Sequence, residues 1–359
     1  CRSGDVLCLA STPSFDANRF VKGLTGPEYK ALSEYDRKPL FNKALTATYP
    51  PGSTFKTMVA LAALEAGVSP DRTYVCNKVW FWGGRPWHCD QAHGVLNMHN
   101  AIKVSCDIFF YQTALGIGPD KIANVARKFG LGQTFDIGIP GQKPGIVPDT
   151  AYKRRAFPHD PVWHPGETPS MGIGQGYVNV NALQLAVMVS RLANGWRAIQ
   201  PRLVHSIGGV VQAQGGPAPE LPFAREHLDF VRAAMASVAN DAGGTAFRYV
   251  QLGLGPIKMA GKTGTAQAHG YTGGHGEHGA QGEWAQRDHA WFVAFAPYDD
   301  PRYAMSVLVE HGGWGAEAAA PKAAQLMRVA LLKDPEVRAR IIAPLPQNAP
   351  PDAPTASPT

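Results

Sequence analysis

The chain has 359 residues, of which 45% are hydrophobic and 17% are charged. A chain of this length and composition can bury a large core, which excludes a disordered or collagen-like protein. Its 34 Lys and Arg residues against 28 Asp and Glu residues give a formal net charge of +6. They form no basic block of the kind that marks nucleic-acid binding, and no apolar stretch reaches the roughly 18 residues of a membrane span.

The predicted strands lie at both ends of the chain and the predicted helices in the middle. We expect a first strand over residues 3–10. Helical patterns follow at 53–66, 97–114, 119–129, 181–194 and 225–240. Strand patterns return at 257–266, 289–297 and 302–311, and a turn-rich connection makes the last two an antiparallel hairpin. This segregation predicts an α+β fold, with an antiparallel sheet flanked by helices and a helical subdomain between the early and late strands.

The composition divides the chain into three regions. Residues 1–35 begin abruptly within a turn and strand pattern, without an initiator methionine, so we expect an upstream part that could hold a membrane anchor. Residues 36–333 form the expected main domain, whose last packed helix is predicted at 318–332. Residues 334–359 are expected to be a disordered proline-rich tail, with room for a short extra helix ending at Ile341.

Ser53 and Lys56 are the first candidate catalytic residues. They follow Pro50-Pro-Gly52, which interrupts the backbone, and precede an apolar helical pattern, so Ser53 should lie at or near a helix N-terminus. Residues i and i+3 of a helix lie about 5–6 Å apart at Cβ, so the Lys56 amine can reach the serine oxygen. A lysine whose pKa is lowered can activate a serine. For this tetrad alone, a capped helix with an exposed lysine is the alternative.

Two further motifs follow along the chain. Ser105-Cys106-Asp107 gives S-x-D, and Lys262-Thr-Gly-Thr265 gives K-T-G-T. With S-x-x-K, S-x-D and K-T-G in this order, the chain resembles the penicillin-binding protein and serine β-lactamase superfamily over residues 36–333. The resemblance implies the α+β fold of that superfamily, with a catalytic cleft between the sheet edge and the helical part.

Other segments make the chain similar to the class B penicillin-binding proteins, rather than to β-lactamases. These are Leu9-Ala-Ser-Thr-Pro-Ser-Phe-Asp16, Gly172-Ile-Gly-Gln-Gly176 and Gly243-Gly-Thr-Ala246. The E-x-x-L-N glutamate that deacylates class A β-lactamases is absent. Asp107, where asparagine is commoner, resembles the elongation-type group usually called penicillin-binding protein 2. The resemblance implies an inner-membrane protein with a periplasmic catalytic domain, whose partner is the polytopic glycosyltransferase of the elongation complex.

The resemblance further implies a peptidoglycan D,D-transpeptidase that β-lactams inhibit covalently. Ser53 would attack the carbonyl between the two D-alanines of a stem peptide, and Lys56 would accept its proton. Lys262 would help to keep Lys56 neutral, and Ser105 would relay a proton to the leaving amine. Asp107 would orient Lys56 and the substrate amide, although a carboxylate here would also tend to raise a lysine pKa.

The K-T-G motif would bind the substrate. Thr263 and Thr265 would offer hydroxyl groups to its carboxylate, and Gly264 would let it approach the strand. The N–H groups of Ser53 and Thr265 would form the oxyanion hole. A serine β-lactamase or D,D-carboxypeptidase, which uses water as acceptor, is the alternative within the superfamily. A β-lactam sensor domain that acylates once and signals is the alternative outside catalysis.

A cysteine and histidine cluster predicts a second site. The five cysteines are Cys1, Cys8, Cys76, Cys89 and Cys106, an odd number that leaves at least one unpaired. Cys76, Cys89, His93 and Cys106 could hold a structural zinc ion, although their spacing is not that of a standard finger. A Cys76–Cys89 disulfide, with Cys106 buried and free, is one alternative in an oxidising compartment, and unrelated core cysteines are the other. Other possible ligands nearby are His88, Asp90 and His99. The implied family requires no cofactor for catalysis.

A second group of histidines follows the K-T-G motif. It comprises His269, His275, His278 and His289, in sequence rich in Gly and Gln. This group could bind a metal, but the composition favours a solvated loop beside the cleft, in which the histidines are incidental.

Overall fold

The structure is a computed structural model that describes residues 1–195, 197–212, 218–268 and 283–342. Its helices are α1 (Ala17–Lys22), α2 (Gly26–Ser33), α3 (Lys56–Glu65), α4 (Met98–Lys103), α5 (Asp107–Ile117), α6 (Pro119–Lys128), α7 (Thr150–Ala156), α8 (Glu167–Gly172), α9 (Ala182–Asn194), α10 (Arg225–Asn240), α11 (Ala320–Lys333) and α12 (Pro335–Ile342). Its strands are β1 (Tyr74–Trp82), β2 (Arg85–Leu96), β3 (Ser206–Ile207), β4 (Val210–Val211), β5 (Ala260–Ala266), β6 (His289–Ala296) and β7 (Tyr303–Val309). Shorter helical turns are η1 (Gly52–Phe55), η2 (Trp284–Gln286) and η3 (Gly315–Ala319).

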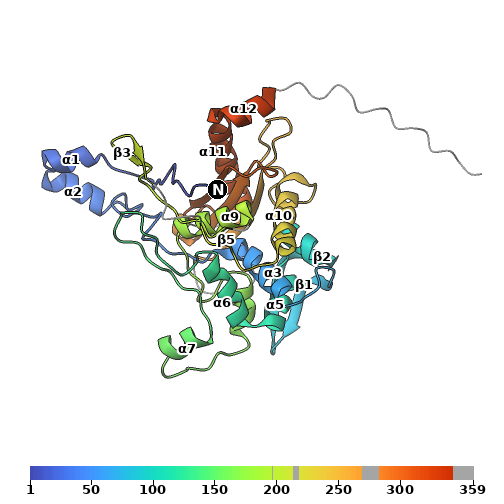
Figure 1. The fold of residues 1–359 in the computed structure, drawn as a ribbon. Helices are drawn as coiled ribbons and strands as arrows, with labels where there is room; N and C mark the ends of the chain where they lie inside the picture. The colour runs from blue at the N-terminus through green and yellow to red at the C-terminus, as the bar shows by residue number, and fades with distance from the viewer. Residues whose placement is uncertain (196, 213–217, 269–282, 343–359) are drawn as a thin grey trace, which may run out of the picture.

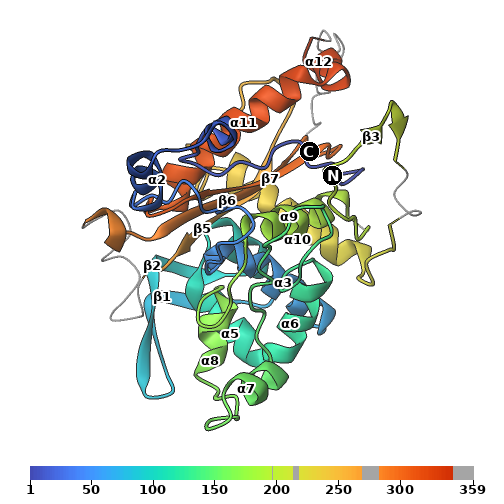
Figure 2. The same cartoon turned by 90° about the vertical axis from the view of Figure 1, so that its left-hand side faces the viewer.

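An antiparallel sheet of three strands, in the order β5-β6-β7, forms the centre of the molecule. Every residue of β6 is buried, as expected for an almost wholly apolar strand with a layer on each face. Figures 1 and 2 show α11 on one side of the sheet and α9 and α10 on the other. The predicted hairpin is confirmed, and so is the pairing of the K-T-G strand beside it, with Lys262 opposite Val293. The α+β class is therefore confirmed.

The helical part lies on the side of the sheet away from α11 (Figure 2). Its central helix is α3, which contacts α5, α6 and α10. Residues 56–64 of α3 are all buried, because the sequence Lys-Thr-Met-Val-Ala-Leu-Ala-Ala-Leu offers small or apolar groups on every side. Packing on all sides holds the first turn of α3 rigidly, and this turn begins at Lys56.

The sequence predicts one helix over 97–114, but the structure has two, and the break between them carries the second motif. The break spans Val104 to Cys106, and Ser105 has a φ of 60°, which no helix interior allows. Cys106 is extended, and its sulfur accepts the N–H of Phe109 as the N-cap of α5. The unbroken apolar pattern hid this break.

The prediction for the first strand needs correction. Residues 3–10 form no strand, because only an isolated bridge joins Asp5 to Arg202. At the other end of the chain, the short extra helix expected to end at Ile341 is present as α12, and its Val337 is buried in the core. The remainder of the predicted tail, 343–359, lies outside the described residues.

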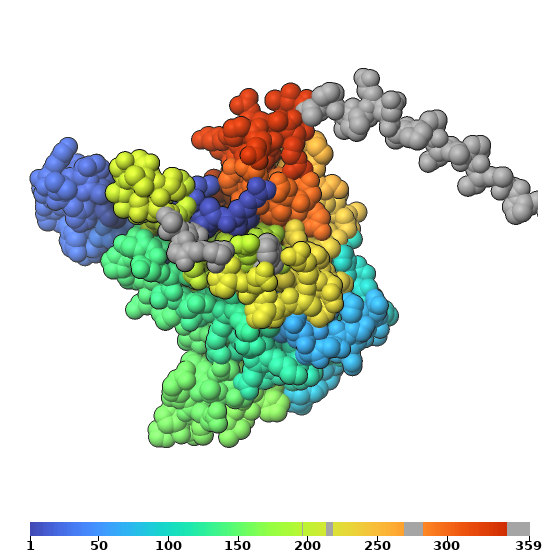
Figure 3. Space-filling view, viewed as in Figure 1, coloured from blue at the N-terminus to red at the C-terminus, as the bar shows by residue number. Residues whose placement is uncertain are grey.

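Two projecting elements were not predicted. β1 and β2 form a long hairpin whose turn residues, Gly83 and Gly84, both have positive φ. α1 and α2 contain no buried residue and form a lobe that projects from the body, as Figure 3 shows. Among the described residues, no helix is long and apolar enough to cross a membrane.

Candidate active site

The fold brings the three sequence motifs into one site. η1 carries Ser53 and leads directly into α3 at Lys56. The break before α5 carries Ser105, α5 begins at Asp107, and β5 carries Lys262. Ser53 is half-exposed, whereas Lys56 and Lys262 are fully buried at 0% exposure. The candidate nucleophile is therefore accessible to solvent, whereas the two lysine amines are not.

Lys56 is surrounded by groups of the second motif. Its Nζ donates to the backbone oxygen of Ser105 at 2.6 Å and lies 3.3 Å from Ser105 Oγ. It also forms a buried ion pair with the Asp107 carboxylate. The backbone break at Ser105, where φ is positive, directs the Ser105 oxygens and the Asp107 carboxylate toward Lys56.

Lys262 also contacts the Ser105 hydroxyl group. Its Nζ donates to Ser105 Oγ at 2.8 Å and to the backbone oxygen of Thr263 at 3.2 Å. Burial holds the pKa of Lys262 well below the ordinary lysine value, and the charge of Lys56 is the second cause of this shift. The charge of Asp107 opposes the shift. The sequence led us to expect Lys262 as the charge that keeps Lys56 neutral. The structure instead pairs Lys56 with a carboxylate and depresses the pKa of Lys262.

Direct backbone contact joins the serine turn to the K-T-G strand. Gly52 has a φ of 54°, and a Cβ placed on it would overlap the carbonyl oxygen of Thr265. A Cβ on Gly264 would lie 2.8 Å from the carbonyl oxygen of Pro51. Trp291 fixes the same turn from β6, since its Nε1 donates to the oxygen of Pro50 at 3.1 Å. Both glycines are required because the two segments touch without room for a side chain.

The hydroxyl groups of the K-T-G strand lie in a row. Thr263 and Thr265 are two positions apart on β5, so their side chains point to the same face. Thr263 Oγ1 also lies 2.9 Å from Oγ1 of Thr245, in the loop after α10. The segment Gly243-Gly-Thr-Ala246 contributes to the family resemblance, but sequence reasoning assigned Thr245 no part in the site. Its only signal was that resemblance.

The predicted zinc ligands also come together. His93 Nδ1 lies 3.5 Å from the sulfur atoms of both Cys76 and Cys89, and the sulfurs of Cys89 and Cys106 are 4.0 Å apart. All four ligand atoms lie within 4.8 Å of one another. The alternative Cys76–Cys89 disulfide is wrong, because all five cysteines are free in the structure. The alternative ligands His88, Asp90 and His99 do not belong to the group.

This cluster contacts the second motif directly. The backbone N–H of Asp107 donates to Cys89 Sγ at 3.3 Å. Cys106, the N-cap of α5, lies between Ser105 and Asp107 in the chain. The cluster therefore holds the backbone break against the β1–β2 hairpin. Of the second histidine group, His269, His275 and His278 lie outside the described residues, and His289 is buried in β6.

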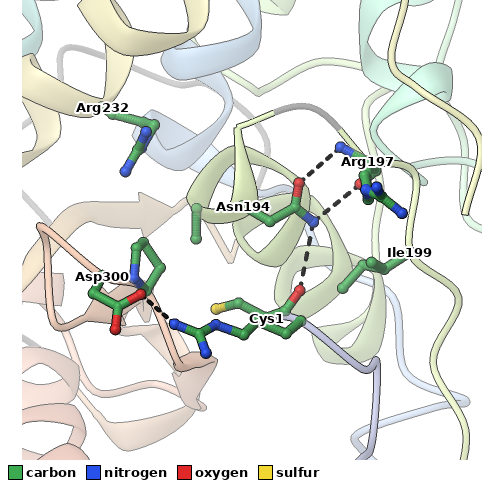
Figure 4. A pocket seen from close by; sticks show the side chains of 9 residues that line it. Cys1, Asn194, Arg197, Ile199, Arg232 and Asp300 are labelled. Atoms are coloured by element: carbon green, nitrogen blue, oxygen red, sulfur yellow. Dashed lines mark hydrogen bonds and ion pairs between the residues drawn. The ribbon is translucent and has the colours of Figure 1, made fainter. Parts of the chain in front are cut away.

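A separate cavity of about 440 Å³ shares no residue with the three motifs. In Figure 4, Asn194 lies between Cys1 and Arg197, and its side-chain amide donates to the backbone oxygens of both, at 3.5 and 3.0 Å. Arg2 and Asp300 form an ion pair in its wall. These polar groups of the cavity wall therefore already have hydrogen-bond or ion-pair partners within the chain.

Comparison with known proteins gives a consistent result. Residues 1–328 match the family described as "Penicillin binding protein transpeptidase domain". The "Peptidoglycan D,D-transpeptidase MrdA" of Escherichia coli K12 is 34% identical over 336 residues, which cover 91% of this chain and 52% of that protein. The crystal structure of Pseudomonas aeruginosa PBP2 in complex with WCK 5153 has a TM-score of 0.81 at 35% identity, covering 93% of this chain and 72% of that one.

A complex of PBP2 and MreC from Helicobacter pylori is also similar, with a TM-score of 0.79 at 30% identity, covering 92% of this chain and 57% of that one. The chain spans about half the length of the curated relatives named MrdA. The match over nearly the whole chain, with the three motifs gathered in one site, places the chain in the family of penicillin-binding protein transpeptidase domains.

Proposed function

We propose that the chain is the catalytic domain of a peptidoglycan D,D-transpeptidase that works through an acyl-enzyme on Ser53. The observation that carries this proposal is the position of Ser105 Oγ, which lies 2.8 Å from Lys262 Nζ and 3.3 Å from Lys56 Nζ. The Ser105 hydroxyl group joins the buried amines of Lys56 and Lys262. Together these groups can carry a proton away from Ser53, which lies one helical turn before Lys56. The curated relatives are named for the same activity.

In the acylation step, Ser53 Oγ bonds to the carbonyl carbon between the two D-alanines of a stem peptide. The amide C–N bond breaks, and the terminal D-alanine leaves as an amine that takes up a proton. Thr263 and Thr265 offer hydroxyl groups to the substrate carboxylate from one face of β5. The N–H groups of Ser53 and Thr265 stabilise the tetrahedral oxyanion, since direct contact of Gly52 with Thr265 keeps these two segments together.

The charges of the site favour Lys262 as the final proton acceptor in acylation. Lys56 is ion-paired with Asp107, and the pKa of Lys262 is depressed. Lys56 can pass a proton to Ser105 Oγ while Ser105 passes its own to an unprotonated Lys262 amine, a form that the lowered pKa of Lys262 makes more accessible, along contacts of 3.3 and 2.8 Å. Lys56 then takes the proton of Ser53. The net result is the transfer of one proton from Ser53 to Lys262. Lys262 can then deliver a proton to the leaving amine through Ser105.

The second half-reaction distinguishes the proposal from its alternatives. In a transpeptidase, the amine of a neighbouring stem attacks the ester carbonyl, a new amide forms, and Ser53 recovers its proton. A β-lactamase or D,D-carboxypeptidase would use water instead, and a sensor domain would not turn over. The absence of an E-x-x-L-N glutamate favours an acyl-enzyme that survives until an amine arrives.

Benzylpenicillin tests this proposal. We expect the intact protein to gain the mass of one penicillin, located on the peptide that contains Ser53, and to keep it after free penicillin is removed. A thioester analogue of the stem peptide with a D-amino acid as acceptor should then give more aminolysis than hydrolysis. Rapid loss of the adduct as hydrolysed penicillin would favour a β-lactamase. A stable adduct without any turnover of the thioester would favour a sensor.

The cellular setting is proposed from relatives. One structural neighbour is a complex of PBP2 with MreC, and another is described as a peptidoglycan synthase complex that coordinates polymerization and crosslinking. We infer that this domain works in the periplasm at the inner membrane, beside a polytopic glycosyltransferase of the elongation complex. Peptidoglycan stem peptides and β-lactams are its expected ligands.

We also propose that Cys76, Cys89, His93 and Cys106 hold a structural zinc ion. Zn–S bonds of about 2.3 Å and a Zn–N bond of about 2.0 Å in a tetrahedron separate two sulfurs by about 3.8 Å, and a sulfur from the nitrogen by about 3.5 Å. The observed separations of 4.0 and 3.5 Å fit these values. The metal would tie the β1–β2 hairpin to the start of α5.

Metal analysis tests the zinc proposal. Protein kept from chelators should contain about one zinc ion per chain. His93→Ala should reduce this to near zero and lower the melting temperature, because the three cysteines then lose the metal ion that joins them. His205→Ala, which changes an exposed histidine outside the cluster, is the matched control and should keep the metal. A zinc content near zero in the unmodified protein would refute the site.

A further inference from the structure

One short segment touches both sides of the expected oxyanion hole. The N–H of Gly52, which precedes Ser53, donates to the backbone oxygen of Gly174 at 3.0 Å. The side-chain amide of the next residue, Gln175, donates through Nε2 to the backbone oxygen of Thr265 at 3.2 Å. The two N–H groups proposed to stabilise the oxyanion belong to Ser53 and Thr265. Residues 174 and 175 therefore connect the two halves of that hole.

The connecting segment is itself held firmly. Gly174 and Gln175 donate their backbone N–H groups to Met171 and Ser170, both at 2.9 Å, so the segment continues the end of α8. α8 packs closely on α5, since a Cβ on Gly172 would lie 2.6 Å from Ala114 Cβ. Gln175 is only 7% exposed. A side chain that is buried against its acceptor, on a backbone held by hydrogen bonds, has little room to adopt another rotamer.

We propose that Gln175 is a positioning residue that keeps the Thr265 N–H directed at the reacting carbonyl. This inference rests on the proposed acyl-enzyme at Ser53. An oxyanion hole works only while its donors point to the same place, and here they come from η1 and from β5, which are distant in sequence. A hydrogen bond to the Thr265 carbonyl limits rotation of the backbone at that residue, and Gly174 fixes the Ser53 side. Gln175 thus sets the spacing between the donors.

The chemistry of the contact explains why a glutamine suits this position. The carbonyl oxygen of Thr265 only accepts hydrogen bonds, so the group that faces it must be a donor. Methionine has a similar length but no donor, and asparagine keeps the amide on a shorter side chain that does not reach. Both variants remove the contact while they leave the size or the polarity of the site nearly unchanged.

A competing interpretation makes the opposite prediction. If the Gln175 amide merely covers the Thr265 carbonyl and must move aside for substrate, its removal should accelerate acylation. Under the positioning role, removal should slow the chemical step without weakening the initial binding of the β-lactam. The two roles therefore differ in the sign of the effect.

The test compares Gln175→Met with the unmodified protein, by stopped-flow acylation with benzylpenicillin. We expect the acylation rate constant to fall about tenfold, a fraction of the 10²–10³ typical for loss of a whole oxyanion donor, while the dissociation constant of the non-covalent complex stays unchanged. The infrared band of the ester carbonyl in the acyl-enzyme should move to higher wavenumber, because a misdirected donor polarises the carbonyl less. A purely structural role would not move that band.

Gln184→Met is the matched control. Gln184 is also buried, and its side chain donates to the carbonyl oxygens of Gln133 and Pro144, away from the three motifs. It should lower the melting temperature but leave the rate constant and the carbonyl band unchanged. Should Gln175→Met not fold, Gln175→Asn gives the same readouts. An unchanged rate and band in the folded variant, or a faster rate, would overturn the proposal, whereas loss of labelling in the unmodified protein would overturn the proposed function instead.

Discussion

Replacing Ser53 with alanine is expected to abolish covalent labelling by benzylpenicillin. The Ser53 oxygen is the atom that forms the ester, and neither buried lysine can replace it, because both are held by contacts to Ser105. Loss of a catalytic nucleophile costs on the order of 10⁶ in the turnover rate of a serine hydrolase. Ser53 is half-exposed in a turn that Gly52 and Trp291 hold in place, so the variant should fold. Intact-protein mass spectrometry measures the loss.

The matched control is Ser33→Ala, which removes an exposed hydroxyl group from the projecting α2. This variant should acquire the penicillin adduct at the rate of the unmodified protein. The melting temperature of both variants, measured without β-lactam, shows whether either substitution damages the fold. If Ser53→Ala still gained one penicillin per chain, another nucleophile would have to be sought and the mechanism would fail.

Replacing Lys262 with methionine should reduce the acylation rate by about 10²–10⁴, the range typical of a lost general base. Burial and the charge of Lys56 lower the pKa of Lys262, so its neutral amine is available at lower pH than that of an ordinary lysine. As the pH falls through the pKa of Lys262, this amine gains a proton and can no longer accept one through Ser105. The acylation rate of the unmodified protein should therefore decline on the acidic side.

Stopped-flow acylation across a pH series measures this dependence. Lys262→Arg separates charge from proton acceptance, because a guanidinium stays protonated in proteins. It should be as slow as Lys262→Met at neutral pH and should lose the dependence on the pKa of Lys262. Lys258→Met, at an exposed position just before β5, is the matched control and should behave like the unmodified protein. A normal rate in Lys262→Arg would show that the residue supplies charge and does not accept the proton.

The helical start at Ser53 and the hairpin of β6 and β7 were predictable because their signals are local. Pro50 to Gly52 mark a break, and alternating or continuous apolar residues mark the strands. The β1–β2 hairpin also had a local signal, the Gly83-Gly84 pair, which favours a two-residue turn and was not used. The break at Ser105 had none. Its residues continue the apolar helical pattern, and the positive φ is stabilised by contacts with Lys56 and Lys262 from other elements.

The amino-acid sequence by itself determined which chemical groups this protein carries, namely a nucleophilic serine, two lysines, a hydroxyl-lined strand and a set of thiols with an imidazole. The tertiary structure decided how those groups share protons and charge. Ser105 and Lys262 are 157 positions apart, and only folding places them 2.8 Å from each other. The depressed pKa of Lys262 likewise arises from complete burial beside Lys56. The contact of Gln175 with Thr265 spans 90 positions and leaves no local trace in the sequence. Burial and long-range contact depend on packing of the whole chain, whereas residue identity and spacing are local.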